Sequence, residues 1–436
     1  MMSSLWGRAT RLGGRATRSL LLLAPFFFLT YGAATLLTSM RTEVGSIVYA
    51  WERSIPFWPW TIVPYWSIDV FYGISLFICT TDHELDVHVR RLLTAQLVAV
   101  ICFILFPLTF TFDRVIPDGF AGWLFNALAQ FDRPFNQAPS LHIALLVILW
   151  TRYAHHVSGF ARVVMDAWFA LVGASVLTTY QHHFIDVPTG ALLGFACLWL
   201  WPEDGPGPFA EFRRTDDPAR ARLARYYTMG TLALLIAGVA IGGAGLWLIW
   251  PAVSLGLVAA NYGFLGAAGF QKDADGAMGL GARWLYAPYI AAAWLNSRIW
   301  TRRDAASVPI GDDVFLGRIP ARRIAFASVI DLCAELPGLA KTPAWRAMPM
   351  LDLVAPAPGQ LRSLAGMIER TRTAGPVLVC CALGYGRSAA AVATWLLITD
   401  RVDTIDAAYE RIRRVRPGVV VTAATRDAID TATRST

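Results

Sequence analysis

The first two-thirds of the chain is a succession of long apolar runs separated by short polar segments. These runs lie near residues 19–38, 60–80, 93–112, 140–157, 163–181, 186–201, 226–250 and 252–271. An α-helix needs about 20 mainly apolar residues to cross the hydrocarbon core of a bilayer. The pattern therefore predicts eight transmembrane helices, six in a first unit and two after an interruption.

The interruption is the stretch 202–225, which is rich in Pro, Gly and charge, and we assign residues 206–225 to a linker. Residues 281–300 combine Trp, Tyr and Arg, which fits either an interfacial helix or a ninth span. Near residue 306 the long runs stop. The later segment VLVCC, at 377–381, predicts a short buried strand that leads into a glycine-containing loop and an alanine-rich helix. A multi-pass α-helical membrane domain is therefore followed by an α/β domain over 306–436.

Basic residues open the chain, with Arg8, Arg11, Arg15 and Arg18 placed before the first apolar run. A cleaved signal peptide would begin in the same way. The run is long enough to span, however, and no small-residue cleavage site follows it. We expect an uncleaved first span with its N-terminus in the cytoplasm.

Composition agrees with a membrane protein, because 56% of the residues are hydrophobic and only 16% are charged. The net charge of +7 does not predict a nucleic-acid partner, since the basic residues flank apolar runs. We assign Arg90, Arg91, Arg152 and Arg162, with the Arg-rich stretch 213–225, to alternate loops on the cytoplasmic side. Eight spans leave the C-terminal domain in the cytoplasm, where thiols stay reduced, whereas a ninth span would export it.

Six cysteines occur, with neither disulfide nor zinc spacing, and no metal or cofactor is predicted. Cys381 has a distinctive setting between a strand and a helix. A helix N-terminus and a nearby Arg387 stabilise a thiolate, which is the nucleophilic form of cysteine. Gly384 and Gly386 let backbone N–H groups turn inward around an anion, and the Arg387 guanidinium can bind two phosphoryl oxygens. The loop is suited to holding a phosphate against sulfur.

Cys381, five further residues, Arg387 and Ser388 form the signature of cysteine-dependent phosphatases. Over residues 306 to 430 the chain resembles the dual-specificity branch of the protein tyrosine phosphatase superfamily. The resemblance implies that Cys381 forms a phosphocysteine, that Arg387 binds the equatorial oxygens, and that Ser388 helps the sulfur to leave. Cys380 departs from the family, which usually has His at that position.

A general acid is expected from a separate upstream loop, because the leaving oxygen lies opposite the nucleophile. Asp352, in MPMLDLVAP, stands where the family usually places its acid, after a predicted strand and before a Pro-rich turn. Asp331, in ASVIDLCAE, competes for this role, although the family has a structural strand end there. We assign the acid to Asp352.

The membrane unit carries a second group of ionisable residues, which are costly beside membrane spans and so indicate function. Arg133 precedes Pro-Ser-Leu-His, with Ser140 and His142 at the start of an apolar helix. His182 and Asp186 are four residues apart, so on a helix the carboxylate can orient the imidazole and leave its other nitrogen free to attack.

These residues resemble the type 2 phosphatidic acid phosphatase superfamily over residues 55 to 205. The resemblance implies a phosphohistidine at His182, assistance from Asp186, a general acid at His142, and phosphate ligands at Ser140 and Arg133. Two cations that the phosphatases usually have are missing, since Asn126 and Val176 stand at their positions. Transfer of a phosphoryl head group between lipids therefore competes with hydrolysis.

The sequence thus predicts two metal-free phosphoryl-transfer sites in one membrane protein. It divides into residues 1–54 with the first span, the membrane unit 55–205, the linker 206–225, two further spans and an interfacial helix in 226–305, and the phosphatase-like domain 306–436. Lipid phosphates are the expected substrates and the bacterial inner membrane is the expected location. The alternatives are a membrane-tethered protein phosphatase acting on phosphoproteins, a lipid-binding sensor and, least favoured, a transporter.

Overall fold

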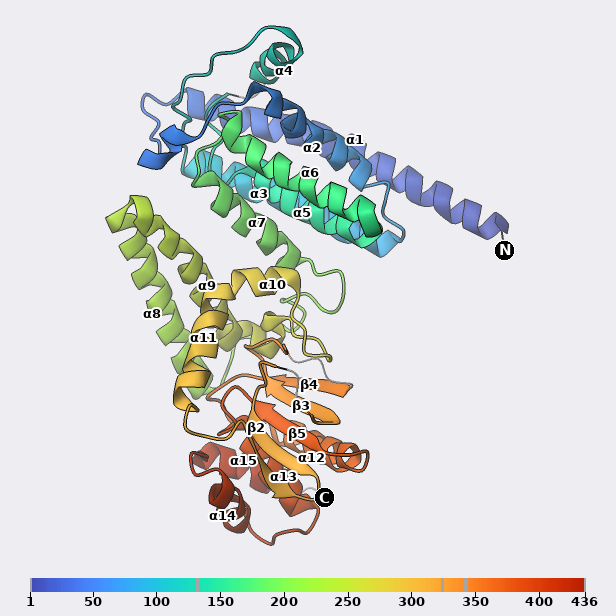
Figure 1. Ribbon diagram of the computed structural model, residues 1–436, viewed down its shortest axis with the longest axis vertical. Helices are drawn as coiled ribbons and strands as arrows, with labels where there is room; N and C mark the ends of the chain where they lie inside the picture. The colour runs from blue at the N-terminus through green and yellow to red at the C-terminus, as the bar shows by residue number, and fades with distance from the viewer. Residues whose placement is uncertain (1, 131–132, 323–324, 340–343, 435–436) are drawn as a thin grey trace. The chain divides into compact units, whose positions relative to one another are not determined.

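The computed structural model describes residues 2–130, 133–322, 325–339 and 344–434 (Figure 1). The chain divides into two compact units. The N-terminal unit comprises Met1–Asp204 with Ile241–Ala244, and the C-terminal unit comprises Gly205–Ala240 with Gly245–Thr436.

The N-terminal unit is a helical bundle built around one central helix, α5. Its helices are α1 (Met2–Ser39), α2 (Ile62–Ser75), α3 (Asp82–Leu105), α4 (Gly119–Ala129), α5 (Leu141–His156), α6 (Gly159–Thr178) and α7 (Asp186–Leu200), with short 3-10 helices at Ala50–Ser54 and Pro59–Thr61. α5 packs against α2, α3, α6 and α7. Ser140 caps α5 by accepting the backbone N–H of Ile143, which satisfies one of the free donors of the first turn.

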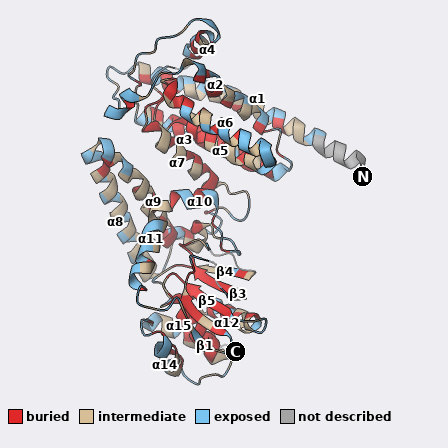
Figure 2. Ribbon diagram, viewed as in Figure 1, coloured by how far each residue is buried: buried red, intermediate tan, exposed pale blue. Residues whose placement is uncertain are grey.

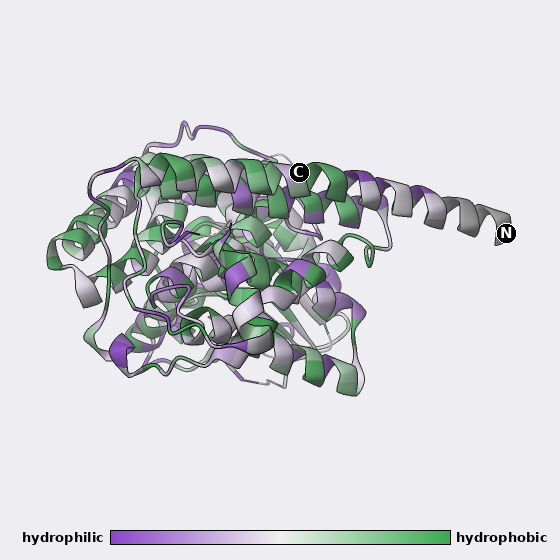
Figure 3. Ribbon diagram, turned by 90° about the horizontal axis from the view of Figure 1, so that it is seen from above, coloured by the Kyte–Doolittle hydropathy of each residue, from purple (hydrophilic) through white to green (hydrophobic). Residues whose placement is uncertain are grey.

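Five helices in the described part of the chain are long and apolar enough to cross a membrane. They are Thr10–Ser39, Asp82–Leu105, Gly159–Thr178, Pro218–Ile241 and Gly243–Phe270. Three other predicted spans form helices that are shorter, since α2, α5 and α7 have 14, 16 and 15 residues. Along the coloured part of α1, the portion towards the N-terminus is more hydrophilic than the rest of the helix (Figure 3).

The assignment of basic residues to loops is wrong at most of these positions, because the helices extend beyond the apolar runs. Arg90 and Arg91 lie inside α3, Arg152 inside α5 and Arg162 inside α6. The last part of the predicted linker, 218–225, belongs to the helix Pro218–Ile241. Arg152 is buried and donates hydrogen bonds to Glu203 at 2.9 and 3.1 Å as well as to Glu84. Its charge is therefore neutralised inside the bundle, as a buried charge requires.

The helical part of the C-terminal unit begins with a hairpin. One arm is α8 (Pro218–Ile241), and the other runs through α9 (Ile249–Ala260) to the π-helix Asn261–Leu265 and the 3-10 helix Gly266–Phe270. The arms are antiparallel, because a Cβ added at Gly230 would meet Leu255 at 3.1 Å and one added at Gly263 would meet Ala224 at 3.7 Å. We call the end of the hairpin formed by Pro218 and Asn261–Phe270 its base.

A five-stranded sheet forms the centre of the remaining chain. Its strands are β1 (Ser307–Gly311), β2 (Val314–Arg318), β3 (Ser328–Cys333), β4 (Ala344–Met350) and β5 (Val377–Cys381), in the order β1-β2-β5-β3-β4. β2, β5, β3 and β4 are parallel, and β1 is antiparallel to β2. β3 and β5 are buried along their whole length, as central strands covered on both faces are (Figure 2).

Helices cover both faces of this sheet. α12 (Pro358–Arg372), α13 (Arg387–Ile398), α14 (Ile405–Val415) and α15 (Ala423–Arg434) enclose the larger core on one side. On the other side α11 (Ala287–Trp300), which follows α10 (Leu280–Leu285), packs Ile290, Ala293 and Trp294 against the sheet. The segment 281–300 is therefore two helices, and α11 contributes one face to the sheet's covering.

Candidate active site

The loop between β5 and α13 surrounds the sulfur of Cys381. Cys381 is the last residue of β5 and is only 3% exposed. Its Sγ accepts hydrogen bonds from the backbone N–H of Gly384 at 3.3 Å and from the hydroxyl of Ser388 at 3.2 Å. A sulfur with two donors aimed at it is an environment that stabilises negative charge.

The carbonyl groups of this loop are held outward by donors from other segments. The bonds run from Ile319 N to Cys381 O at 2.8 Å, from Ser297 Oγ to Ala382 O at 2.6 Å, from an Arg416 amino group to Leu383 O at 2.6 Å, and from Val420 N to Tyr385 O at 3.1 Å. With these carbonyls engaged outside, the loop has the form of a backbone nest that binds anions.

Of the two glycines predicted to shape the loop, Gly384 is required by its geometry. Its φ is +78°, and a Cβ there would lie 2.5 Å from the carbonyl oxygen of Gly317. Gly386 precedes α13 with φ −110°, and an added Cβ would meet nothing within 4 Å. Steric constraints therefore require glycine at position 384 but not at position 386.

The guanidinium of Arg387 is fixed by acidic partners. It donates to Glu335 through two bonds of 2.7 and 2.6 Å and to the Met350 carbonyl at 2.8 Å, and it lies 3.0 Å from Asp352. The fork geometry holds the plane of the guanidinium. Burial alone would raise the pKa of Glu335, but the paired Arg387 outweighs it and the pKa lies below its usual value.

Glu335 is a site residue that the sequence reasoning missed. The usable signal was an acidic residue just past β3, the strand that pairs with β5 next to the nucleophile. Parallel neighbouring strands end at the same edge of a sheet, so a carboxylate there is close to Arg387.

The two acidic residues that compete as general acid have different surroundings. Asp331 is fully buried and bound by Lys272, which also donates to the carbonyls of Cys333 at 2.6 Å and Leu336 at 2.7 Å. This ion pair links Lys272, just after the hairpin, to the end of β3. The carboxylate of Asp331 therefore has a structural role.

Asp352 lies beside Arg387, and 35% of its side-chain surface remains accessible. The surrounding protein still strips water from the carboxyl, and this burial together with the charge of Glu335 raises its pKa, against the opposing effect of Arg387. A raised pKa keeps a carboxyl protonated closer to neutral pH, which suits a proton donor. The geometry favours Asp352.

We expect Glu335→Gln to move the basic limb of the pH–kcat/KM profile, which reports the free enzyme, to lower pH, by on the order of one unit. The substitution removes a negative charge that raises the pKa of Asp352, so the acid loses its proton earlier as pH rises. kcat at the optimum also falls, because Arg387 loses the fork that orients it. Glu410→Gln, at an exposed pair with Arg414, serves as the control. A limb that stays in place or rises would contradict the assignment of Asp352.

In the N-terminal unit, the structure brings Ser140, His182 and Asp186 together. His182 Nδ1 lies 3.1 Å from Asp186 Oδ2, and His182 Nε2 lies 3.1 Å from Ser140 Oγ. Asp186 Oδ2 also accepts the backbone N–H of His183 at 3.0 Å. All three site residues are buried. The carboxylate thus fixes the ring, and the second ring nitrogen faces a hydroxyl.

His142 and Arg133 are placed differently. His142 stacks on Tyr65 with ring centroids 4.1 Å apart, and its buried Nε2 has no hydrogen-bond partner among the described residues. Arg133 is exposed on the loop before α5, and in the described part of the chain it forms no hydrogen bond with His182 or Ser140. The predicted phosphate ligand at Arg133 is therefore not assembled with the others.

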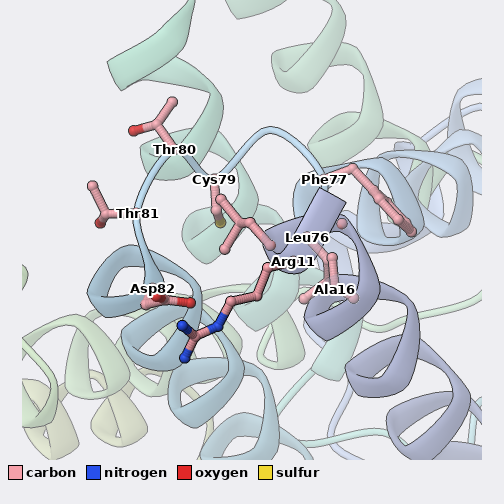
Figure 4. Close-up of a pocket in the computed structure, with 10 residues that line it drawn as sticks. Arg11, Ala16, Leu76, Phe77, Cys79, Thr80, Thr81 and Asp82 are labelled. Carbon is pink, nitrogen blue, oxygen red and sulfur yellow. The ribbon is translucent and has the colours of Figure 1, made fainter. Parts of the chain in front are cut away.

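A cavity of about 420 Å³ reaches this histidine group. Its walls are mainly apolar side chains of α1, α2 and α5, including Phe27, Tyr65 and Leu145, and His142 and His182 also line it. A second cavity of about 780 Å³ lies between α1 and the turn joining α2 to α3, where Arg11 extends towards Asp82 (Figure 4). The first cavity combines an apolar wall with polar groups, as sites for amphipathic ligands do.

His183, next to His182, is structural. Its Nδ1 lies 2.9 Å from Glu52, and its Nε2 accepts the backbone N–H of Thr111 at 3.2 Å. Both ring nitrogens are therefore engaged. Across the described residues, no group of three or more His, Cys, Asp or Glu side chains is arranged to hold a metal ion.

Comparison with known proteins gives matches to solved structures alone. No family model and no curated protein matches the chain. The solved structures include phosphatases of the protein tyrosine and dual-specificity types. Tk-PTP in its active form is 24% identical, over 30% of this chain and 98% of its own, with a TM-score of 0.25. Human DUSP28 is 19% identical, over 30% of this chain and 95% of its own, with a TM-score of 0.27. PTPMT1 in complex with PI(5)P is 15% identical, over 30% and 96%, with a TM-score of 0.25.

Proposed function

We propose that the C-terminal unit is a cysteine-dependent phosphomonoester hydrolase held at a membrane by its own apolar helices. One observation carries this proposal. The sulfur of Cys381 lies at the end of a central strand inside a backbone nest, within hydrogen-bond distance of Gly384 N and Ser388 Oγ, and the neighbouring Arg387 is oriented by Glu335.

The reaction proceeds in two steps. The Cys381 thiolate attacks phosphorus, the bond to the leaving oxygen breaks, and Asp352 gives that oxygen its proton. Water then attacks the phosphocysteine, with Asp352 now accepting a proton, and the sulfur departs as a thiolate that receives the Ser388 hydrogen bond. The substrate phosphate replaces the Asp352 carboxylate on Arg387, and Asp352, released from the cation, takes up from solvent the proton that it then donates.

The substrate is a phosphate ester reachable at a membrane surface. A lipid phosphate is our main proposal, with the cytoplasmic face of a bacterial inner membrane as the location, since a reducing compartment preserves the thiol. Membrane attachment raises the local concentration of lipid head groups relative to soluble esters. The alternative is a tethered protein tyrosine or dual-specificity phosphatase that acts on phosphoproteins.

The deciding experiment is phosphate release by the detergent-purified full chain from lipid phosphates and from phosphopeptides. Wild type is compared with Cys381→Ser and His182→Ala. If lipid turnover vanishes with Cys381→Ser and survives His182→Ala, the C-terminal unit is the lipid phosphatase. If phosphopeptide turnover alone depends on Cys381, the protein phosphatase alternative holds.

A second candidate activity belongs to the N-terminal unit. We propose that His182 is the nucleophile of a lipid phosphate phosphatase or head-group phosphotransferase, with Asp186 orienting its ring and His142 as general acid. The supporting observations are the His182–Asp186 contact of 3.1 Å and the apolar cavity that reaches His182. The unpartnered, buried Nε2 of His142 at this cavity is a polar atom available to a ligand.

The Cys381→Ser variant should keep any lipid-phosphate turnover or exchange that the N-terminal unit catalyses. We expect His182→Ala to reduce this remaining activity by at least about 100-fold, because the covalent nucleophile is lost. The measurement is transfer of labelled phosphate between lipids in the Cys381→Ser background. His155→Ala, at a half-exposed histidine near the end of α5, is the matched control. If the protein with both Cys381→Ser and His182→Ala is as active as Cys381→Ser alone, a phosphohistidine at His182 is ruled out.

A further inference from the structure

The base of the hairpin touches the loop that carries the general acid. Tyr262, in the π-helix Asn261–Leu265, is only 2% exposed, and its hydroxyl donates a hydrogen bond of 3.0 Å to the backbone carbonyl of Asp352. The two residues are 90 positions apart in the sequence. A residue of the apolar hairpin is therefore in direct contact with the acid loop.

Tyr262 is itself held in place by two residues of α8, one of which packs on α11. Its ring stacks on Tyr227 of α8, with centroids 5.5 Å apart, and Tyr227 in turn meets Tyr289 of α11 edge-on at 5.9 Å. The Nε of Arg220 donates to the Tyr262 carbonyl at 3.1 Å. The hydroxyl is thus presented to Asp352 from a packed group and not from a mobile loop.

The backbone of Asp352 has to be held in place for Asp352 to act as the general acid. The Asp352 carboxylate lies on Arg387 and has to leave it when phosphate binds, while its backbone stays in place. The next residue, Leu353, has φ +57°, in the left-handed region that leucine rarely adopts. Leu353 is also 73% exposed, so side-chain packing does little to hold this turn. The bond from Tyr262 fixes the backbone next to the strained residue.

Tyr289 connects the same group to the other acidic residue. Burial raises its pKa, and the nearby charge of Glu335 raises it further. Tyr262 of the hairpin thus contacts the Asp352 backbone, and Tyr289 of α11 lies close enough to Glu335 to feel its charge.

We propose that Tyr262 is a positioning residue for the general acid, so that the membrane hairpin completes the active site of the C-terminal unit. The proposal rests on the function proposed above, and in particular on Asp352 as the acid. Tyr262 acts on the leaving-group step through the backbone of Asp352 and does not touch the phosphate.

The test uses the full-length protein in detergent and two esters, 4-nitrophenyl phosphate and phenyl phosphate. The nitrophenolate leaves without help, whereas phenolate needs a proton from the acid. Tyr262→Phe keeps the ring stacking and removes the hydroxyl. We expect kcat/KM, which reports phosphoryl transfer to Cys381 and not the later hydrolysis, to fall about 5- to 10-fold on phenyl phosphate, the value of one hydrogen bond, and less than about twofold on 4-nitrophenyl phosphate. In an Asp352→Asn background, Tyr262→Phe should cause no further loss on either ester.

Tyr286→Phe is the matched control, because its buried hydroxyl bonds to Asn261 and the Gly269 carbonyl at the same hairpin base without contacting Asp352. Thermal unfolding of each variant reports on the fold. Equal losses of kcat/KM on both esters, a loss matched by Tyr286→Phe, or a further loss in the Asp352→Asn background would each overturn the proposal and leave Tyr262 a structural residue. An Asp352→Asn variant with undiminished kcat/KM on phenyl phosphate would overturn the assignment of the acid itself, and with it this role for Tyr262.

Discussion

A Cys381→Ser variant of the full-length protein should release phosphate from its ester substrate at least about 1,000-fold more slowly than wild type. A serine hydroxyl stays protonated at neutral pH, and the described loop offers Cys381 hydrogen-bond donors and no neighbouring base. The nest and Arg387 remain, so substrate affinity should change little. Initial rates of phosphate release measure the loss, and acid-quenched wild type should carry one phosphoryl group on the peptide that contains Cys381.

The adjacent thiol supplies the control for this prediction. Cys380 is fully buried and packs on the other face of β5, with Val329, Cys333 and Leu378. Cys380→Ala should therefore retain activity within a few-fold, provided that the variant is folded. A phosphorylated Cys380, or full activity in Cys381→Ser, would show that the nucleophile has been assigned to the wrong residue.

The second large effect is expected for Arg387→Lys, which should lower kcat/KM by about 100- to 1,000-fold. Lysine keeps the charge but loses the planar fork, so it can match neither two phosphoryl oxygens nor the two oxygens of Glu335 at once. The loss should appear mainly in kcat, because the equatorial oxygens gain charge in the transition state. Steady-state kinetics on a single soluble aryl phosphate separate kcat from KM.

Arg401→Lys is the matched control for this substitution. Arg401 pairs with Asp312 at 2.7 Å and lies over the ring of Trp395, in the same unit but outside the catalytic loop. Its replacement should leave kcat/KM unchanged within about twofold, as expected for a partly exposed ion pair. Similar losses in the two variants would mean that Arg387→Lys acts through stability and not through phosphate binding.

The nucleophile loop was predictable because its chemistry is local. Cys381, Gly384, Arg387 and Ser388 lie within eight residues, and the strand, turn and helix that present them follow from the same short segment. The left-handed φ of Gly384 is likewise a property of one turn. Gly386 shows the limit of this reasoning, since the pattern assigned it the same role but the space around it does not require glycine.

The supporting residues were not predictable because each reaches the loop from a distant part of the sequence. Glu335 is 52 positions from Arg387, and Ser297 is 85 positions from Ala382. The sequence favoured Asp352 over Asp331 only through the family resemblance, and the physical difference between them, Lys272 on Asp331 and Arg387 beside Asp352, appears only in the packed structure. In the N-terminal unit, His182 and Asp186 are in contact as expected, but not through helical spacing, because His182 lies in the turn between α6 and α7 and Asp186 is the first residue of α7. The contact with Ser140, 42 positions away, depended on how α5 and α7 pack.

The membrane helices show the same difference between what the local sequence predicts and what depends on distant residues. Long stretches of hydrophobic residues are enough to indicate membrane helices, since the cost of burying polar groups in lipid acts on each segment separately. The ends of those helices, the burial of Arg152 among carboxylates and the contact of Tyr262 with Asp352 depend on partners elsewhere in the chain. Local backbone preference and hydropathy act within a few residues, whereas ion pairs and hydrogen bonds between distant residues exist only once the whole unit has packed.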